Sequence, residues 1–587
     1  MRGVRPFTVL VLAISGCAHP RAAPPPSAPP VERLATTPPP AKGPDVVDGG
    51  VGAPTVEGLL AGMTLEQKVG QLMMVGFAGQ RVDDEVTALV RGHHAGGVCL
   101  FGRNVASAAQ IATLNDDLRA LMVDAVPPFI AVDQEGGNVV RVDEGNLVLP
   151  GNMLLGATRD PHLAFEAGYQ QGQDLKRLGF NMNLAPVLDV NSNPRNPVIG
   201  IRAFSDDVAV VSELGAQFVQ GQQEASVVTV AKHFPGHGGV ELDSHRALPV
   251  LRLNRAQLSA QLEPFRVAAA AGLDGMMTAH IAMPAISGDD TPATLSQPVL
   301  GGLLRDELKF QGLVLTDELE MDAIDHRYGV GHAAVLAINA GADMVLIPWR
   351  LEKKTEVWEA LLEAARSETL PRERLDAAVR RILTVKLKRG VFEPLAPRDE
   401  RLAELGKSRA LADVIARAGV TLLRSSKAFP LKARQRVAVI TPEASLADAL
   451  GRRLPHLEKM VVSAFPPAAS RDALKVQARE LANRSEVVVV GVANTRQLEL
   501  LDMVALTGKP TVMVVLGAPY LANAGAKAQV VVQVYSYRAA ATEAAAAALV
   551  GEAGTPGRLP VTLPGSPFGT RLDPVGQKKA HRAQRVP

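Results

Sequence analysis

The sequence predicts an α/β protein in which an N-terminal (β/α)8 TIM-like barrel is followed by a C-terminal α/β/α sandwich. Eight short apolar runs alternate with amphipathic helical stretches over residues 56–390, and five more apolar runs follow a proline-containing break. Apolar runs without strict polar alternation are typical of parallel strands that are buried on both faces. Eight strand–helix units in succession fit a closed barrel better than an open sheet.

The barrel strands are predicted from the apolar runs in order. They fall at residues 71–77, 97–101, 129–133, 181–184, 227–233, 275–280, 313–317 and 343–347. The helices between them are predicted at residues 83–91, 106–121, 162–178, 207–224, 255–271, 298–308 and 331–340. Polar residues end four of the strand runs, namely Asp133, His233, His280 and Asp317. Because the carboxyl ends of barrel strands meet on the face where such folds place their chemistry, we expect these side chains to converge.

A second unit follows a linker at residues 391–405 and occupies residues 406–570. Its parallel sheet is predicted from runs at residues 437–440, 460–464, 487–492, 511–516 and 530–534, with helices at 446–453, 471–482 and 539–549. This alternation is typical of an α/β/α sandwich. The last residues, 571–587, form a polar, basic tail.

The N-terminus has the pattern of an export signal. Residues 1–16 carry two arginines, an apolar run and the small pair Ser15-Gly16 directly before Cys17. This order predicts a cleaved signal peptide. The segment Ile14-Ser15-Gly16-Cys17 resembles the lipobox of bacterial lipoproteins. We therefore expect a lipid on Cys17, anchoring in the bacterial cell envelope, and outer-membrane delivery because Ala18 rather than aspartate follows. The proline-rich residues 17–55 are predicted to be a semi-rigid tether.

Composition excludes several classes of function. Lysine and arginine total 62 against 60 acidic residues, and the net charge of +2 argues against a nucleic-acid partner. Two cysteines exclude a disulfide scaffold. Aromatic residues make up 4% of the chain, which disfavours a long stacked cleft and leaves a compact polar pocket possible. The sequence leaves the oligomeric state open.

The densest chemical signal is the segment K-H-F-P-G-H-G at residues 232–238, followed after four residues by D-S-H at residues 243–245. In an extended loop, alternate residues point the same way, so Asp243 can hydrogen-bond one nitrogen of His245. The other nitrogen is then available for proton transfer near neutral pH. His237, Asp243 and His245 also offer metal-ligand types, but their spacing matches no compact zinc pattern, and we predict no metal.

This long motif resembles the signature of the β-N-acetylglucosaminidase branch of glycoside hydrolase family 3. Other segments resemble the family in the same order along the chain, so that the likeness covers residues 56–570. They are A-V-D-Q-E-G-G (131–137), N-L-A-P-V-L-D (183–189), N-P-V-I-G-I-R-A-F (196–204), L-T-D-E-L-E-M (315–321) and G-R-L-P-V-T-L-P (557–564).

The resemblance implies a retaining exo-acting glycosidase that needs no cofactor and removes a terminal β-linked N-acetylhexosamine from peptidoglycan- or chitin-derived glycans. It implies that Asp317 is the nucleophile, since a carboxylate suits attack on an oxocarbenium-like centre. It also implies that His245 is the general acid/base and Asp243 its orienting partner. The residues that would hold the carbohydrate substrate are Asp133, Arg141, Arg202, Lys232 and His233.

Alternatives stay open at this point. A neutral imidazole does not repel phosphate, so the chain can instead be a β-glycoside phosphorylase of the same family. The general acid can also be a glutamate of the second domain, such as Glu499, by resemblance to other branches of the family. A catalytically inactive cell-wall-binding lipoprotein is a third possibility, although the intact catalytic set argues against it. Trp349, just past the eighth run, can flank the pocket or merely pack.

Overall fold

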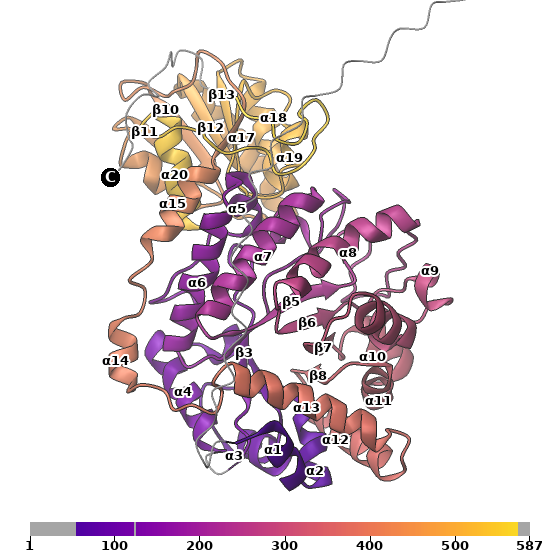
Figure 1. The fold of residues 1–587 in the computed structure, drawn as a ribbon. Coiled ribbons are helices and arrows are strands. Elements are labelled where there is room, and N and C mark those ends of the chain that lie inside the picture. Colours follow the sequence, from indigo (N-terminus) through magenta and orange to yellow (C-terminus); the bar gives the residue numbers. More distant parts are fainter. Residues whose placement is uncertain (1–53, 123–124, 573–587) are drawn as a thin grey trace, which may run out of the picture. The chain divides into compact units, whose positions relative to one another are not determined.

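The computed structural model describes residues 54–122 and 125–572, and these contain the predicted closed barrel of eight parallel strands (Figure 1). Each strand pairs with the next, and β8 pairs with β1 to close the cylinder. The strands are β1 (Met73–Val75), β2 (Gly97–Leu100), β3 (Phe129–Val132), β4 (Met182–Asn183), β5 (Val228–Phe234), β6 (Gly275–Thr278), β7 (Leu313–Glu318) and β8 (Met344–Ile347). All eight overlap the predicted runs.

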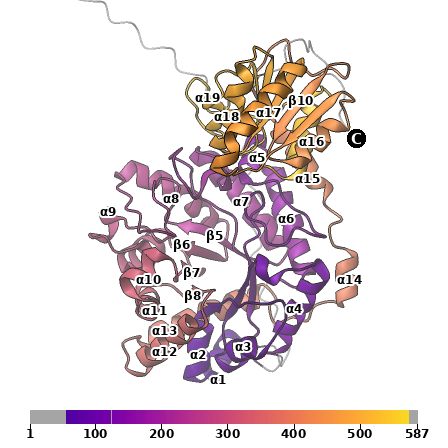
Figure 2. The ribbon, with the colours of Figure 1, turned by 180° about the vertical axis from the view of Figure 1, so that it is seen from behind.

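Helices surround this barrel (Figure 2). They are α1 (Val56–Gly62), α2 (Leu65–Gln71), α3 (Asp84–Thr87), α4 (Ala108–Ala120), α5 (Asn152–Thr158), α6 (Pro161–Arg177), α7 (Val208–Glu224), α8 (Arg255–Ala270), α9 (Pro284–Ser287), α10 (Asp322–Tyr328), α11 (Val330–Ala340), α12 (Leu351–Arg366) and α13 (Arg372–Lys388). The predicted helix at 298–308 is a π-helix, η5 (Pro298–Glu307). Local capping fixes several starts: Asp160 accepts two backbone hydrogen bonds at the start of α6, and Pro161 supplies its first residue.

The apolar core explains why the strand runs lack polar alternation. Met74, Val98, Ile130 and Met344 all lie in one buried cluster that fills the barrel and the layer beneath its helices. These strands face side chains on both sides, so both faces are apolar. The same packing leaves the strand ends as the place where polar residues can face solvent.

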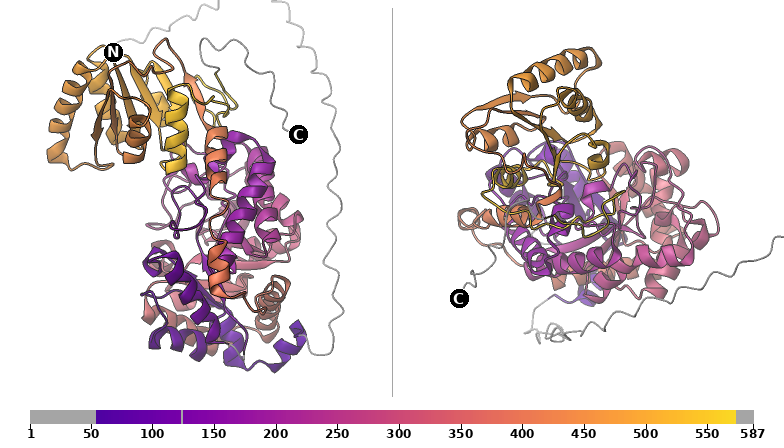
Figure 3. Two further views of the ribbon diagram at one scale, coloured as in Figure 1. Left: turned by 90° about the vertical axis from the view of Figure 1, so that its left-hand side faces the viewer. Right: turned by 90° about the horizontal axis from the view of Figure 1, so that it is seen from above.

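The second domain has a six-stranded sheet in the order β11-β10-β12-β13-β14-β9. Its strands are β9 (Thr421–Arg424), β10 (Val437–Thr441), β11 (Leu457–Val461), β12 (Val487–Val492), β13 (Thr511–Val515) and β14 (Val530–Gln533). Helices pack on both faces of the sheet (Figure 3): α15 (Ala410–Gly419), α16 (Ala444–Gly451) and α20 (Ala539–Leu549) pack together, as do α17 (Arg471–Arg484) and α18 (Thr495–Ala505), and α19 (Leu521–Ala524) is a short further helix. The predicted α/β/α sandwich is confirmed.

Two details of the sequence prediction are wrong. The sheet is mixed and not parallel, because β9 runs antiparallel to β14 at one edge. Strand β9 was not predicted, since it has only four residues. The strand predicted at 460–464 is β11, which ends at Val461. Part of the predicted linker is helix α14 (Arg398–Ala403), in which Arg401 pairs with Asp116 at 2.6 Å.

The predicted lipidation site, Cys17, lies outside the described residues, as do residues 1–16, nearly all of the proline-rich segment, and the tail beyond residue 572. In residues 54–122 and 125–572, no helix is long and apolar enough to cross a membrane.

Candidate active site

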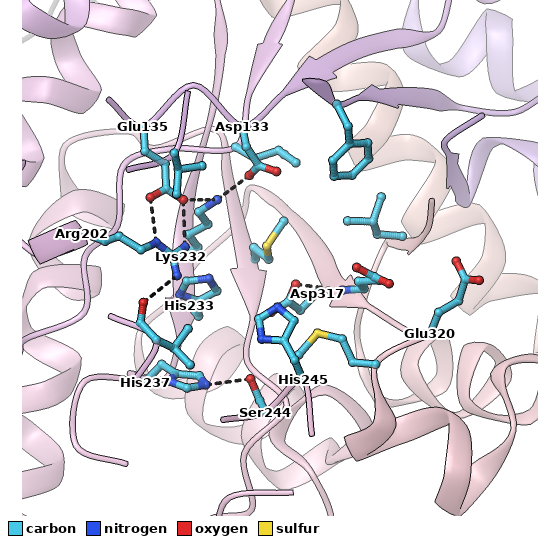
Figure 4. Close-up of a pocket in the computed structure, with 18 of the residues that line it drawn as sticks. Asp133, Glu135, Arg202, Lys232, His233, His237, Ser244, His245, Asp317 and Glu320 are labelled. Carbon is cyan, nitrogen blue, oxygen red and sulfur yellow. Dashed lines mark hydrogen bonds and ion pairs between the residues drawn. The ribbon is translucent and has the colours of Figure 1, made fainter. Parts of the chain in front are cut away.

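The carboxyl ends of the barrel strands surround a cavity of about 650 Å³ (Figure 4). That size is within the range of small-molecule sites. Seven of the predicted site residues line it, namely Asp133, Arg141, Arg202, Lys232, His233, His245 and Asp317. Asp243 is joined to the site through its hydrogen bond to His245. The structure therefore brings together residues that are spread over 185 positions of the chain, from 133 to 317.

Asp317 lies near the end of β7 and faces this cavity. Its Oδ1 accepts a 2.9 Å hydrogen bond from the backbone N–H of Glu318. Burial raises the pKa of Asp317, but the neighbouring His233 and His280, together with that N–H, outweigh burial and bring the pKa below its ordinary value. Asp317 is consequently ionised at neutral pH, the form in which a carboxylate is a nucleophile.

His280 supports the backbone beside this carboxylate. Its Nε2 donates to the carbonyl of Glu318 at 2.9 Å, and its Nδ1 lies 2.8 Å from the hydroxyl of Thr294. Burial lowers the pKa of His280, which favours the neutral ring. The strand-end histidine predicted at 280 thus fixes the end of β7.

The loop after β5 carries the Asp243–His245 pair. Nδ1 of His245 is 2.7 Å from Oδ1 of Asp243, and the same oxygen accepts the backbone N–H of His245 at 2.9 Å. Burial raises the pKa of Asp243, but its bonds to His245 outweigh this and hold the pKa below the usual value. Because Asp243 occupies Nδ1, Nε2 is the nitrogen left for proton transfer. The His245 side chain is 59% exposed at the cavity, on the same side as Asp317 (Figure 4).

A buried network of charges forms the base of the cavity. Nζ of Lys232 lies 2.6 Å from Asp133 and 2.8 Å from Glu135. Arg202 makes two 2.9 Å hydrogen bonds to the carboxylate of Glu135. Arg141 is nearer the mouth and lies 3.6 Å from Asp133. These opposed charges hold one another in place, so their remaining hydrogen-bonding positions present a fixed polar surface.

Asp189 organises two histidines above this network. It accepts His233 Nδ1 at 2.7 Å and the backbone N–H of His237 at 2.6 Å. Burial lowers the pKa of His237 to about 4, with the adjacent His233 adding to the effect, so His237 is neutral at pH 7. Its Nε2 lies 3.0 Å from the hydroxyl of Ser244. His237 therefore ties the loop to the strand end, next to the Asp243–His245 pair.

The loop needs glycine at two points. Gly236 has φ +126°, which disfavours other residues. A Cβ at Gly238 would collide with the backbone of Val190. These close contacts bring the P-G-H-G segment against the loop after β4 and explain its composition.

Comparison with known proteins shows the family of the chain. The model of the glycosyl hydrolase family 3 N-terminal domain matches residues 64–385, and that of the family's C-terminal domain matches residues 420–581. The chain belongs to glycosyl hydrolase family 3. It is a glycoside hydrolase, as the resemblance implied.

Relatives of this family 3 enzyme match most of the chain or about half of it. A Pseudoalteromonas piscicida protein named beta-hexosaminidase A is 30% identical over 85% of this chain and 97% of its own length. A beta-hexosaminidase of Alkalilimnicola ehrlichii is 41% identical over 48% of this chain and 80% of its own. The solved structure of a family 3 beta-N-acetylglucosaminidase from Paenibacillus sp. str. FPU-7 has a TM-score of 0.80 and 37% identity, covering 85% of this chain and 99% of that one.

Sequence reasoning missed several site residues of this family 3 enzyme. Glu135 and Asp189 are the central carboxylates of the cavity base, and both stand inside segments that the sequence analysis singled out, at 131–137 and 183–189. Apolar strand runs point to the first polar residue after each strand, whereas these two lie further along. Glu499, the alternative acid, is in helix α18 and does not line the cavity; it lies 3.2 Å from Lys475.

Two further carboxylates lie beside Asp317. Glu320 accepts the backbone N–H groups of Trp349 at 2.7 Å and Arg350 at 2.9 Å, and so ties the end of β7 to the loop after β8. Burial, followed by the charges of Asp317 and Glu320, raises the pKa of Glu318 to about 8. Glu318 is therefore protonated at neutral pH and can donate a hydrogen bond into the cavity.

Proposed function

We propose that this family 3 enzyme is a retaining exo-β-N-acetylglucosaminidase that acts on peptidoglycan- or chitin-derived glycans. One observation carries the proposal: an ionised carboxylate, Asp317, and a carboxylate-held imidazole, His245, face the same cavity. Retaining hydrolysis requires one group that attacks the anomeric carbon and one group that transfers protons.

The first step forms a bond between an oxygen of Asp317 and the anomeric carbon. The bond from that carbon to the leaving oxygen breaks, and the leaving oxygen takes the proton from Nε2 of His245. In the second step, His245 takes a proton from water as the water oxygen attacks the same carbon and frees Asp317. Two displacements leave the configuration unchanged. Asp243 holds Nδ1 of His245 and stabilises the positive charge that the ring carries before the first step and regains in the second.

Sugar recognition follows from the charged base of the cavity. Asp133, Lys232 and Arg202 are fixed by ion pairs of 2.6–2.9 Å and largely removed from water. Fixed charges form strong, directed hydrogen bonds with hydroxyl and acetamido groups. His233 presents the nitrogen that Asp189 leaves unused, and Arg141 closes the outer side. A base closed in this way favours a chain end over an internal sugar.

A panel of p-nitrophenyl glycosides tests this proposal. We expect the β-N-acetylglucosaminide to be hydrolysed faster than the glucoside, galactoside or xyloside, with the β-anomer released first in an NMR time course. A chitooligosaccharide labelled at its reducing end should lose single sugars from the other end. Release of internal oligomers, or preference for another glycoside, would show that the proposal is wrong.

Phosphate is a second acceptor to test, because the proton-transfer residue is an imidazole and not a carboxylate. Reactions with and without inorganic phosphate, analysed for N-acetylglucosamine 1-phosphate, separate hydrolysis from phosphorolysis. We expect free N-acetylglucosamine as the main product in both reactions. A dominant sugar phosphate would instead identify a phosphorylase.

The proposed location is the bacterial cell envelope, with a lipid anchor on Cys17. The supporting observations are the basic and apolar leader, the small pair before Cys17 and the proline-rich residues that follow. Cys17→Ser should move the protein from the detergent phase to the aqueous phase in detergent partitioning. A variant that still partitions with detergent contradicts a lipid at this residue.

A further inference from the structure

Trp349 stands at the mouth of the cavity with 45% of its surface exposed. It follows β8 after a single residue, and its backbone N–H is held by Glu320 at 2.7 Å. The guanidinium carbon of Arg103 lies 4.1 Å from the centre of its ring, and the Phe101 ring centre lies 4.7 Å from it. A large aromatic side chain is thus held firmly in place without being buried.

The two neighbours of this indole lie on one side of it. The guanidinium carbon of Arg103 lies 5.0 Å from the centre of the Phe101 ring, so these two points and the centre of the Trp349 ring form a nearly equilateral triangle. If they covered opposite faces, their separation would be nearly twice as large. Both therefore pack on the same side of Trp349. Because the residue is 45% exposed and lines the cavity, we place its exposed face on the opposite side.

The support beneath the indole is rigid. Nε of Arg103 donates to the carbonyl of Phe77 at 2.8 Å, and Nη2 donates to the carbonyl of Pro348 at 2.8 Å. Arg103 thereby joins the loops after β1, β2 and β8. An aromatic ring fixed in this way loses little further freedom when a flat partner stacks on it.

We propose that the free face of Trp349 binds the leaving group of the reaction, a single pyranose ring whose C–H face stacks on the indole. The inference rests on the proposed function. The terminal N-acetylhexosamine fits the buried charged base, so the ring attached to it points outward to the mouth, where Trp349 stands. A single free aromatic face provides for one ring, which agrees with removal of one sugar from a chain end. Chitin and peptidoglycan fragments both present such a ring.

The test compares two substrates that differ in the leaving group. N,N′-diacetylchitobiose leaves a sugar ring, whereas β-N-acetylglucosaminyl fluoride leaves fluoride, which cannot stack. We expect Trp349→Ala to lower kcat/KM about tenfold on chitobiose, the scale of one aromatic stacking contact, and less than threefold on the fluoride. Trp349→Phe keeps a flat ring and should lose less on chitobiose. The ratio kcat/KM is the right quantity because it reports the step in which the leaving group departs.

The chain offers a matched control in its second tryptophan, Trp358, which stacks on His93 at 4.6 Å and does not line the cavity. Trp358→Ala should change kcat/KM by the same factor on both substrates. Equal losses on both substrates for Trp349→Ala, or no loss on either, overturn the inference. A wild-type enzyme that hydrolyses neither substrate would instead refute the proposed function. Replacing chitobiose with a disaccharide that has N-acetylmuramic acid as the leaving sugar tells which source of ring is preferred.

Discussion

Replacing Lys232 with methionine should destabilise the protein by an amount that the structure sets. The change removes the cation between Asp133 and Glu135, whose side chains are 14% and 2% exposed. Solvent screens charges weakly at that burial, and removing one partner of a buried pair costs about 3–5 kcal/mol. Arg202 keeps two 2.9 Å hydrogen bonds to Glu135, so we expect the lower end, about 3 kcal/mol at pH 7.

Urea unfolding followed by circular dichroism measures this difference in the free energy of unfolding. Lys407→Met is the matched control, because Lys407 pairs with Glu404 at the surface and their side chains are 61% and 51% exposed. A surface pair of this kind contributes about 0–1 kcal/mol. A loss below about 1 kcal/mol for Lys232→Met, or an equal loss for the control, would refute the reasoning.

The pH dependence gives an independent check. Burial raises the pKa of Glu135, but Arg202 and Lys232 outweigh burial and hold the pKa well below its ordinary value. A carboxyl group with a depressed pKa stabilises the fold above its unfolded pKa, and this stabilisation is lost as the pH falls toward the folded pKa. The Lys232 variant lacks part of that stabilisation. The difference in the free energy of unfolding between wild type and Lys232→Met should therefore narrow as the pH falls below about 4.5. A difference that stays constant contradicts the stabilisation of ionised Glu135 by Lys232.

The remaining predictions concern Asp317, His245 and Glu318. Asp317→Ala should lose several orders of magnitude of kcat/KM with good and poor leaving groups alike, whereas His245→Ala should lose about 10²–10⁴-fold, mainly with poor leaving groups. Azide should rescue His245→Ala and give the β-glycosyl azide but give the α-product with Asp317→Ala; β-product from both variants would overturn the two roles. Folding raises the pKa of Glu318 to about 8. Between the pKa of Glu318 in the unfolded state and pH 8, the unfolded state therefore binds fewer protons than the folded state. Over this pH range, the contribution of Glu318 to the free energy of unfolding falls as the pH rises. Glu318→Gln should then stabilise the protein at pH 8 more than at pH 5 in urea unfolding, and an equal effect at both pH values would contradict the raised pKa.

Much of the fold follows from local patterns in the sequence. The eight barrel strands appear as apolar runs because each is buried on both faces, and Asp317, Lys232 and His233 appear because they stand at or beside the ends of such runs. The closeness of Asp243 and His245 was predicted from their spacing, but residues 244–246 form a turn and not the extended loop that was predicted. In this turn, Oδ1 of Asp243 accepts the backbone N–H of His245 and lies 2.7 Å from its Nδ1. The antiparallel strand β9 does not appear, because four residues carry too little pattern and its pairing partner, β14, is more than 100 positions away.

By itself, the sequence determined the barrel, the second α/β domain and the residue types at the strand ends, because burial and spacing are local properties. Only the tertiary structure decided which charged side chains of the site pair with one another. Glu135 meets Lys232, and Asp189 meets His233, across gaps of more than 40 positions. The closeness of Glu318 to Asp317 and Glu320 is visible in the sequence, but its raised pKa requires the burial that folding imposes. Likewise, Trp349 gains Arg103 and Phe101 as neighbours only when barrel closure brings the loop after β8 beside the loop after β2. Charge, burial and stacking depend on distance in space, and for these residues barrel closure sets that distance.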